Sequence, residues 1–116
     1  MQVLLIGDNE YVYRKILDKY YDDDKGVASA AFYGDDLSVD WSMFTSPSDS
    51  FARPPVSRCI VQLQARHPRK VGQQVLHTPK QDNYSHSSII GDKEKQSIRR
   101  YMRNNSTIVF PENLGS

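Results

Sequence analysis

The chain has 116 residues, of which 38% are hydrophobic, so it is long enough for one domain with a core and too short for two. Its formal net charge of +1 makes it neither strongly acidic nor strongly basic. The first residues carry no basic segment, and their apolar run ends at residue 6, which is far too short for a signal peptide or a membrane span. We therefore expect a single cytoplasmic domain over residues 1–116 that does not bind membranes, with a loose tail from about residue 111.

Charge is distributed unevenly along the chain. Residues 1–50 carry four basic and ten acidic side chains, whereas residues 51–116 carry eleven basic and four acidic ones. The two halves can neutralise each other in the fold, or the basic half can face a polyanion. We expect neutralisation, because runs of charge are usually solvated faces of a compact domain. The sequence leaves open whether the halves pair within one chain or between the chains of a homo-oligomer.

The first part of the chain predicts strands, turns and one ambiguous segment. The apolar run at residues 3–6 predicts a buried strand. Residues 9–21 favour a helix, because their apolar residues fit one helical face, although Tyr11-Val12-Tyr13 is also typical of a strand. Residues 22–26 form an acidic turn whose carboxylate spacing does not fit a calcium loop.

Two further strands and a loop follow. Residues 26–33 and 37–41 predict a pair of strands joined by a short turn, and the second of them alternates apolar and polar residues. Residues 45–55 are rich in Ser, Pro and Asp and lie where the charge balance changes. We interpret them as the main loop.

The second half predicts more strands and one helix. Residues 57–65 and 71–77 are expected strands on either side of a basic turn, and residues 78–83 are an expected loop. Cys59 lies in an apolar run and has no second thiol to pair with, so we interpret it as a buried structural thiol. Asp92 can cap a helix over residues 92–104.

That helix has a narrow apolar face, and the remaining residues form a last strand. The apolar face consists of Ile98, Tyr101 and Met102, at the spacing of neighbouring helical turns. Residues 107–110 form the closing strand. These elements together predict an α+β domain with a mostly antiparallel sheet of roughly four to six strands and one clear C-terminal helix. A second helix near the N-terminus is added if residues 9–21 are helical.

All three histidines, His67, His77 and His86, lie in the basic half. Their spacing fits no zinc pattern, so we expect neither a metal nor a cofactor. His86 and His77 could act as acid and base on a phosphodiester, with Lys80 or Arg99 stabilising the developing charge, as in a small metal-independent nuclease or toxin-like enzyme. In the other interpretation the histidines are satisfied by hydrogen bonds and take no part in catalysis.

Residues 83–103 gather polar groups and positive charge more than any other part of the chain. A loop with His86 precedes the expected helix, and Lys93 is expected on the exposed side of that helix. The candidate binding residues of the helix are Lys95, Arg99, Arg100 and Arg103, while Tyr84 offers a ring that could stack on a base. No helix-turn-helix, zinc-finger or RNA-recognition signature accompanies them.

Several short motifs, taken together and in order, resemble a family of small uncharacterised bacterial proteins. The motifs are Tyr13-Arg14, Ser29-Ala30-Ala31-Phe32, Leu37-Ser38-Val39, His86-Ser87-Ser88-Ile89-Ile90-Gly91 and Lys95-Gln96-Ser97-Ile98-Arg99-Arg100. Ala28 and Ser85 depart from the family pattern, which has a serine and an alanine at these places. The match spans most of the chain but implies no reaction, because no activity is established for the family.

The resemblance does imply that a set of polar residues converges, and it adds Arg14 to the candidate binding residues. The set is Arg14, Ser29, Ser38, His86 and Arg99. An early arginine with a serine on a later strand is also faintly similar to ADP-ribosyltransferase sites that hold NAD. However, no glutamate of the chain lies in a suitable catalytic motif for that activity.

The function expected from the sequence is a small bacterial binding or adaptor module rather than an enzyme. Its basic helix and the loop with His86 would engage an acidic partner, either nucleic acid or protein, for example within a multi-component system. The alternative function is the small nuclease or toxin-like enzyme that uses His86 and His77.

Overall fold

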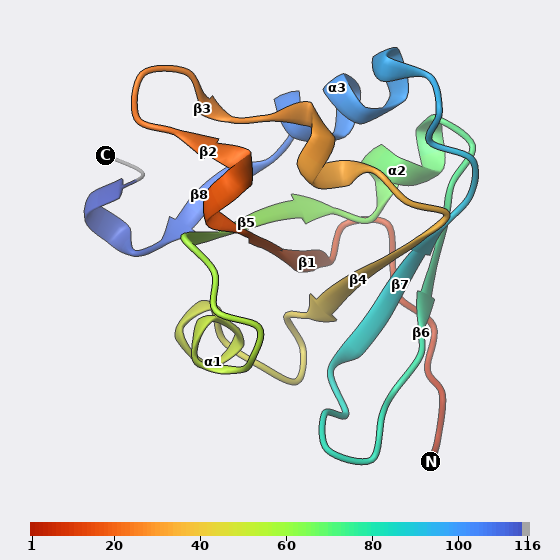
Figure 1. The fold of residues 1–116 in the computed structure, drawn as a ribbon. Coiled ribbons are helices and arrows are strands. Elements are labelled where there is room, and N and C mark those ends of the chain that lie inside the picture. The colour runs from red at the N-terminus through yellow and green to blue at the C-terminus, as the bar shows by residue number, and fades with distance from the viewer. Residues whose placement is uncertain (115–116) are drawn as a thin grey trace.

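The computed structural model describes residues 1–114, which adopt an α+β fold around one antiparallel sheet (Figure 1). The six strands of this sheet lie in the order β6-β7-β4-β1-β5-β8, and their bounds are β1 (Tyr11–Ile16), β4 (Asp36–Trp41), β5 (Cys59–Gln64), β6 (Gln74–His77), β7 (His86–Ile90) and β8 (Thr107–Phe110). A separate hairpin consists of β2 (Tyr21–Asp22) and β3 (Gly26–Val27). The α+β class and the mostly antiparallel sheet predicted from the sequence are therefore confirmed.

Three α-helices and three short 3-10 helices complete the fold of residues 1–114. The α-helices are α1 (Pro47–Ala52), α2 (Arg66–Lys70) and α3 (Gln96–Asn104). The 3-10 helices are η1 (Asp18–Tyr20), η2 (Ser29–Phe32) and η3 (Glu112–Leu114). No helix within residues 1–114 is both long and apolar enough to cross a membrane.

The register of β1 decides which side chains face the core. Val12 lies opposite Trp41 on β4 and Leu63 on β5, so these three side chains share one face of the sheet. We call this the core face. It packs under η2, which contributes the fully buried Phe32, and under α3, which contributes the fully buried Met102. The other face, which we call the outer face, is covered in part by α1 (Figure 1).

The expected strand at residues 3–6 is wrong, because residues 1–10 form no regular element. This segment lies beside β6 without pairing to it as a strand (Figure 1). The Leu4 N–H donates to His77 Nδ1 at 3.0 Å, and Arg69 Nη2 donates both to the carbonyl of Ile6 and to the carbonyl of Val75. The side chains of His77 and Arg69 therefore bond to backbone groups that residues 3–6 and β6 would need in order to pair as strands.

The helix favoured for residues 9–21 is also wrong, since this segment forms β1 and η1. The expected strand over residues 26–33 is largely η2. The main loop at residues 45–55 contains α1, whose N-terminus is capped by Ser46 Oγ accepting from the Asp49 N–H at 3.1 Å. The loop expected around His86 becomes strand β7 from that residue onward.

The C-terminal helix begins later than predicted. Its first residue is Gln96, and the Asp92 carboxylate accepts from the Glu94 N–H in the turn before it instead of capping the helix. Met102 is buried as its predicted apolar face requires. Lys93, expected on the exposed side of the helix, is instead 1% exposed.

Ion pairs join the two oppositely charged halves of the chain. Within residues 1–114 each ion pair links a base of the second half to an acid of the first: Arg53–Asp40, Arg58–Asp18, Arg58–Asp23 and Arg69–Asp8. The carboxylates of Asp8, Asp18 and Asp23 are exposed, so these pairs add little stability. Part of the charge asymmetry is thus neutralised within one chain.

Candidate functional site

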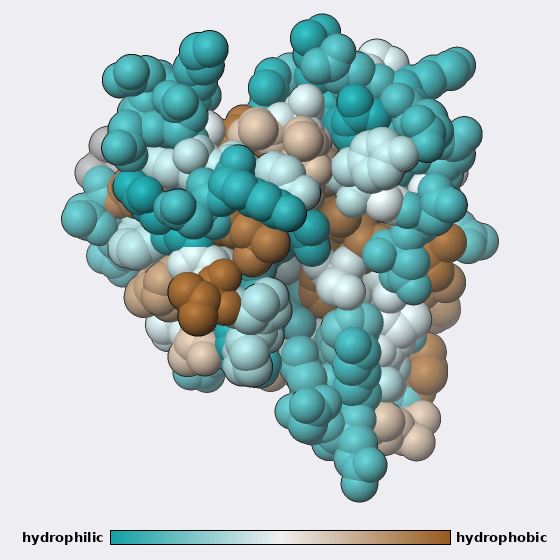
Figure 2. Space-filling view, in the orientation of Figure 1, coloured by the Kyte–Doolittle hydropathy of each residue, from teal (hydrophilic) through white to brown (hydrophobic). Residues whose placement is uncertain are grey.

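A cleft of about 560 Å³ opens on the outer face between the end of α1 and the β6–β7 hairpin. Figure 2 shows this side hollowed between the region of α1 and the hydrophilic hairpin that projects below it. The floor comes from side chains of β1, β4 and β7, and the walls come from the segment after α1 and from the hairpin loop. The lining residues are Tyr13, Arg14, Lys15, Leu17, Ser38, Val39, Asp40, Arg53, Pro54, Pro55, Lys80, Asp82, Asn83 and His86.

A polar row crosses the floor of the cleft. Tyr13 on β1 lies opposite Asp40 on β4, which in turn lies opposite His86 on β7. Residues that are paired across neighbouring strands present their side chains to the same face. The three central strands therefore place a phenol, a carboxylate and an imidazole next to one another.

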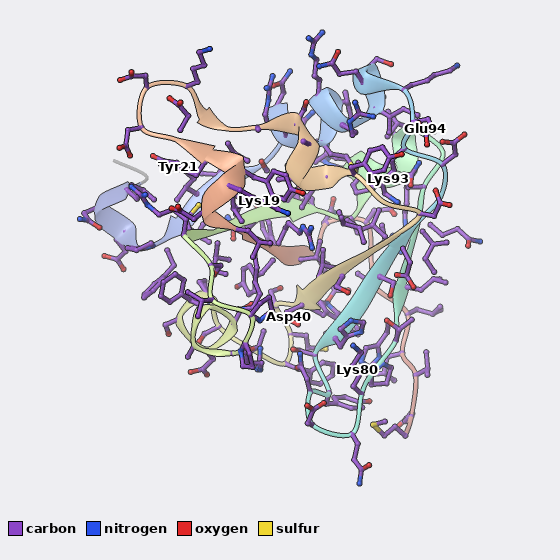
Figure 3. The ribbon with its side chains drawn as sticks, viewed as in Figure 1. Lys19, Tyr21, Asp40, Lys80, Lys93 and Glu94 are labelled. Atoms are coloured by element: carbon purple, nitrogen blue, oxygen red, sulfur yellow. The ribbon has the colours of Figure 1, made fainter. Side chains whose placement is uncertain are left out.

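Asp40 connects both walls of the cleft to its floor. Its side chain is buried and accepts hydrogen bonds from Ser50 Oγ at 2.6 Å, Arg53 Nη1 at 3.1 Å and Asn83 Nδ2 at 2.9 Å. Ser50 lies on α1, Arg53 directly follows it, and Asn83 lies on the β6–β7 hairpin loop. In Figure 3, Asp40 lies between α1 and the labelled Lys80 of the hairpin. A buried carboxylate is tolerable here because several donors satisfy it.

His86 is held in one tautomer. Its Nδ1 lies 2.8 Å from the carbonyl oxygen of Thr78, which can only accept, so Nδ1 carries the proton in the neutral ring. The other ring nitrogen, Nε2, then has a free lone pair and lies 3.3 Å from Ser38 Oγ. The serine hydroxyl can donate to this lone pair.

Arg14 lies where β1 and β4 separate. The two strands pair only at Val12–Trp41 and Tyr13–Asp40, and beyond this point the guanidinium bridges the gap. Nη1 donates to the Ser38 carbonyl at 3.0 Å and Nε donates to the Ala31 carbonyl at 3.1 Å. Nη2 makes no hydrogen bond to the part of the chain that the structure describes. Burial lowers the pKa of Arg14, but a guanidinium stays protonated in proteins.

Two lysines add charge to the cleft. Lys15 on β1 donates from Nζ to the Ser50 carbonyl; burial lowers its pKa, Asp40 opposes this effect and Arg53 adds to it. Lys80 on the hairpin loop is exposed, and its ammonium has no hydrogen bond or ion pair with residues 1–114. Together with Arg14 and Arg53, these residues outnumber the two carboxylates of the lining, and one of those carboxylates is already bonded to Arg53.

His77 and His86 are not brought together. His77 lies opposite Ser87, the neighbour of His86 along β7, so the two imidazoles point to opposite faces of the sheet. His77 is 2% exposed, and its Nδ1 accepts from the Leu4 N–H while its Nε2 donates to the Tyr84 carbonyl at 2.7 Å. Both ring nitrogens are thus occupied by backbone groups.

Tyr84 belongs to an aromatic cluster rather than to the cleft. Its ring lies edge-on to His77, with centroids 4.8 Å apart, and edge-on to Phe44, at 4.7 Å. Its hydroxyl donates to the carbonyl of Gln2 at 2.8 Å. This side chain therefore ties the N-terminal segment to the hairpin.

The basic residues of α3 lie on the opposite side of the sheet from the cleft, because α3 packs over the core face (Figure 1). Arg99 donates from Nη1 to the carbonyls of Lys93 and Glu94. Arg103 donates to Asn104 Oδ1 and lines a second cavity of about 410 Å³. The basic helix and His86, expected to form one surface, thus belong to two separate surfaces.

The remaining candidates of α3 are the exposed residues Lys95 and Arg100. Neither side chain has a hydrogen bond or an ion pair with the described residues. Of the set that the family resemblance implied, Arg14, Ser38 and His86 line the cleft, while Ser29 and Arg99 do not. No group of three or more His, Cys, Asp or Glu side chains within residues 1–114 could hold a metal ion.

The sequence pointed to some cleft residues and missed others. The sequence points to Arg14, Ser38, Lys80 and His86 but not to Lys15, Asp40 and Arg53. A charged residue inside the alternating strand at residues 36–41 was the one available signal for Asp40. The partners of Asp40 lie 10, 13 and 43 residues away, so no local spacing could show them.

Comparison with known proteins gives no relative that could assign a role to these residues. No protein-family model, no curated protein and no solved structure matches the chain. The arguments for function therefore rest on the geometry and charge of the cleft.

Proposed function

We propose that the protein is a binding module that takes up single-stranded nucleic acid in the cleft. The observation that supports it is that the cationic side chains lining the cleft outnumber its carboxylates. Arg14 Nη2 and Lys80 Nζ have no partner within residues 1–114, whereas Arg58 and Arg69 are paired to acids elsewhere. A phosphodiester supplies the anionic oxygens that such donors bind.

The size and lining of the cleft favour a nucleotide over an acidic protein segment. A volume of about 560 Å³ lies within the range of small-molecule sites, so it fits one nucleotide unit rather than an extended flat contact. Ser38 and His86 offer a hydroxyl and an imidazole nitrogen that can match the edge of a base. His86 Nε2 is an acceptor, so it can bond to a base N–H, whereas a carboxylate has no hydrogen to donate to it. Burial raises the pKa of Tyr13, so its phenol stays a neutral donor in the floor.

The salt dependence of binding tests this proposal. Binding of labelled RNA and DNA strands of about ten nucleotides would be measured by fluorescence anisotropy between about 50 and 200 mM salt. If Arg14, Lys15 and Lys80 neutralise the two phosphates that flank one bound nucleotide, the affinity should fall by about sevenfold over this range. The absence of salt-sensitive binding to either strand would refute the proposal.

A matched pair of charge reversals locates the site. Lys80→Glu changes an exposed, unpartnered lysine at the cleft, and Arg100→Glu makes the same charge change on α3, across the sheet. We expect Lys80→Glu to weaken binding by about tenfold and Arg100→Glu to leave it near the wild-type value. The reverse result would place binding on the α3 surface. If a polyglutamate peptide bound more tightly than the oligonucleotides and depended on Lys80, the partner would be an acidic protein.

A further inference from the structure

Ser38 and His86 meet on neighbouring strands of the outer face. Ser38 lies opposite Ser88 and Asp40 lies opposite His86, so His86 is the diagonal neighbour of Ser38 across β4 and β7. A long side chain can span such a diagonal. The resulting distance of 3.3 Å between Ser38 Oγ and His86 Nε2 is within the range seen for a nucleophile and its base before a substrate binds.

The third group of such an arrangement is present as well. The Thr78 carbonyl accepts from His86 Nδ1 at 2.8 Å and so keeps the lone pair of Nε2 directed at the serine. Thr78 Oγ1 lies 3.1 Å from His86 Nδ1 and 2.8 Å from Ser88 Oγ. The contact with Ser88 holds the threonine side chain in place. The base is therefore oriented by groups that do not take part in proton transfer.

Positive charge also lines the cleft. Arg14 alternates with Tyr13 along β1 and so starts from the core face, but its guanidinium reaches the gap between β1 and β4. Arg14 is anchored to the carbonyl of Ser38 itself, and its Nη2 is unused within residues 1–114. Lys15 and Lys80 line the same cleft. These groups can stabilise the negative charge that develops on phosphoryl oxygens when a serine attacks phosphorus.

We propose that Ser38 is a nucleophile activated by His86 and that the cleft transfers a phosphoryl group from a phosphate ester to this serine. A bond forms between Ser38 Oγ and phosphorus, and the bond between phosphorus and the leaving oxygen breaks. His86 Nε2 takes the serine proton and gives it to the leaving oxygen. A water molecule that gives its proton to His86 then attacks phosphorus. The bond between phosphorus and Ser38 Oγ breaks, the phosphoryl group leaves on the water oxygen, and His86 returns the proton to the serine. The phosphate-ester substrate rests on the proposed function, but the reactivity of Ser38 does not.

A neutral phosphorylating probe tests the serine without relying on anion binding. Diisopropyl fluorophosphate would form the bond from Ser38 Oγ to phosphorus and release fluoride, and peptide mass spectrometry would locate the adduct. Ser97 is the internal reference, because it is an exposed serine of α3 with no histidine contact within residues 1–114. We expect labelling at Ser38 to exceed labelling at Ser97 by about 100-fold or more. Equal labelling of the two serines would overturn the proposal.

Variants of the base separate catalysis from folding. We expect His86→Ala to slow Ser38 labelling by about 100-fold and added imidazole to restore part of the rate, which a purely structural role of His86 would not allow. His86→Gln, which keeps a polar side chain of similar length, serves if the alanine variant does not fold by circular dichroism. Labelling at the wild-type rate in a folded His86 variant would contradict the role assigned to this residue.

The two proposals fail in different ways. Labelled RNA and DNA would be incubated in EDTA with the wild type, Ser38→Ala and His86→Ala, with binding measured in parallel. Loss of cleavage in both variants, at protein concentrations at which each variant saturates the strand, supports the serine mechanism. Binding without any Ser38 labelling overturns the mechanism and leaves the binding function intact. Ser38 labelling without nucleic-acid binding supports the nucleophile and refutes the proposed function.

Discussion

Asn83 on the hairpin loop donates a hydrogen bond across the cleft to Asp40 in the middle of the sheet, over a distance of 2.9 Å. The same carboxylate accepts from Ser50 and Arg53 on the other wall. Both walls of the cleft are thus fixed to one buried charge. Within residues 1–114 no other residue of the floor is hydrogen-bonded to both walls, so the shape of the cleft depends on this charge.

We expect Asp40→Asn to destabilise the protein by about 2–4 kcal/mol, because it removes the charge of a buried hydrogen-bonded carboxylate and turns one acceptor into a donor. Asp82→Asn is the control, since Asp82 lines the same cleft but is exposed. Urea unfolding followed by circular dichroism measures both variants. Similar losses for the two variants would show that Asp40 does not hold the walls.

Lys93 is a second buried charge, and it joins the ends of β4 and β7 (Figure 3). Its ammonium donates to the carbonyls of Gly34 at 2.7 Å, Ile89 at 2.8 Å and Gly91 at 3.0 Å, with the Asp35 carbonyl 3.3 Å away. Burial lowers the pKa of Lys93, while nearby carboxylates, Asp35 first, oppose that shift. The ammonium thus ties the turn before β4 to the end of β7.

We expect Lys93→Met to destabilise the protein by about 2–4 kcal/mol, because the methionine fills the space but leaves buried carbonyls without donors. Lys95→Met is the matched control, since Lys95 is exposed and unpartnered within residues 1–114. Its effect should stay within about 0.5 kcal/mol. Thermal and urea unfolding give both values, and an unchanged Lys93→Met stability would refute the role of the ammonium.

The sequence predicted the fold class but not the central strand. Val12 and Ile16 are four residues apart, and this spacing puts two side chains on one face in a helix and in a strand alike. Strand β1 is fixed instead by its pairing with β4 and β5 on both sides, which no local pattern shows. The predicted strands at residues 37–41, 57–65 and 107–110 are confirmed, because these segments alternate or are short and rich in β-branched residues.

Strand β7 was missed for a different reason. It contains Ser87 and Ser88, and serine is not typical of buried strands. Both serines are nevertheless buried, and the Ser87 hydroxyl donates a hydrogen bond to the Ser85 carbonyl. Because the sequence pattern predicts a loop around His86, it does not place this residue beside Ser38. The candidate site therefore became visible only with the register of β4 and β7.

Gly91 ends β7 in a conformation that favours glycine, with φ of +152°. A Cβ atom there would lie 2.6 Å from Gln73 Oε1, and Gln73 is buried and tied to the Asp92 carbonyl through Nε2. We expect Gly91→Ala to cost about 2–4 kcal/mol, from backbone strain plus the displacement of Gln73.

Gly72→Ala isolates the strain contribution. Gly72 also has a positive φ, of +84°, but nothing lies within 4 Å of a Cβ atom at this position. Its cost should be about 1–2 kcal/mol, from strain alone. The free energies of unfolding of both variants would be compared by urea titration. If Gly91→Ala lowered the free energy of unfolding no more than Gly72→Ala, Gln73 would have room to move and the contact with the new Cβ atom would not destabilise the protein.

Cys59 gives a pH-dependent test of the core. It is fully buried on β5, and burial raises the pKa of its thiol to about 11 from an ordinary value near 9.0, with Arg58 opposing the shift. Below pH 9 the thiol is neutral in both the folded and the unfolded chain, so it adds no pH dependence. Between about pH 9 and 11 the unfolded thiol loses its proton while the folded one keeps it.

The free energy of unfolding should therefore fall with rising pH in this window, by up to about 1.4 kcal/mol per pH unit from Cys59. The comparison is between the wild type and Cys59→Ala, because tyrosines and lysines titrate in the same range in both proteins. We expect the wild type to lose stability more steeply than the variant from pH 9 to 10.5, and its thiol to react slowly with a disulfide reagent at pH 8. Parallel stability curves, or a thiol that reacts as fast as in the urea-unfolded chain, would mean that β5 opens to solvent in the native state.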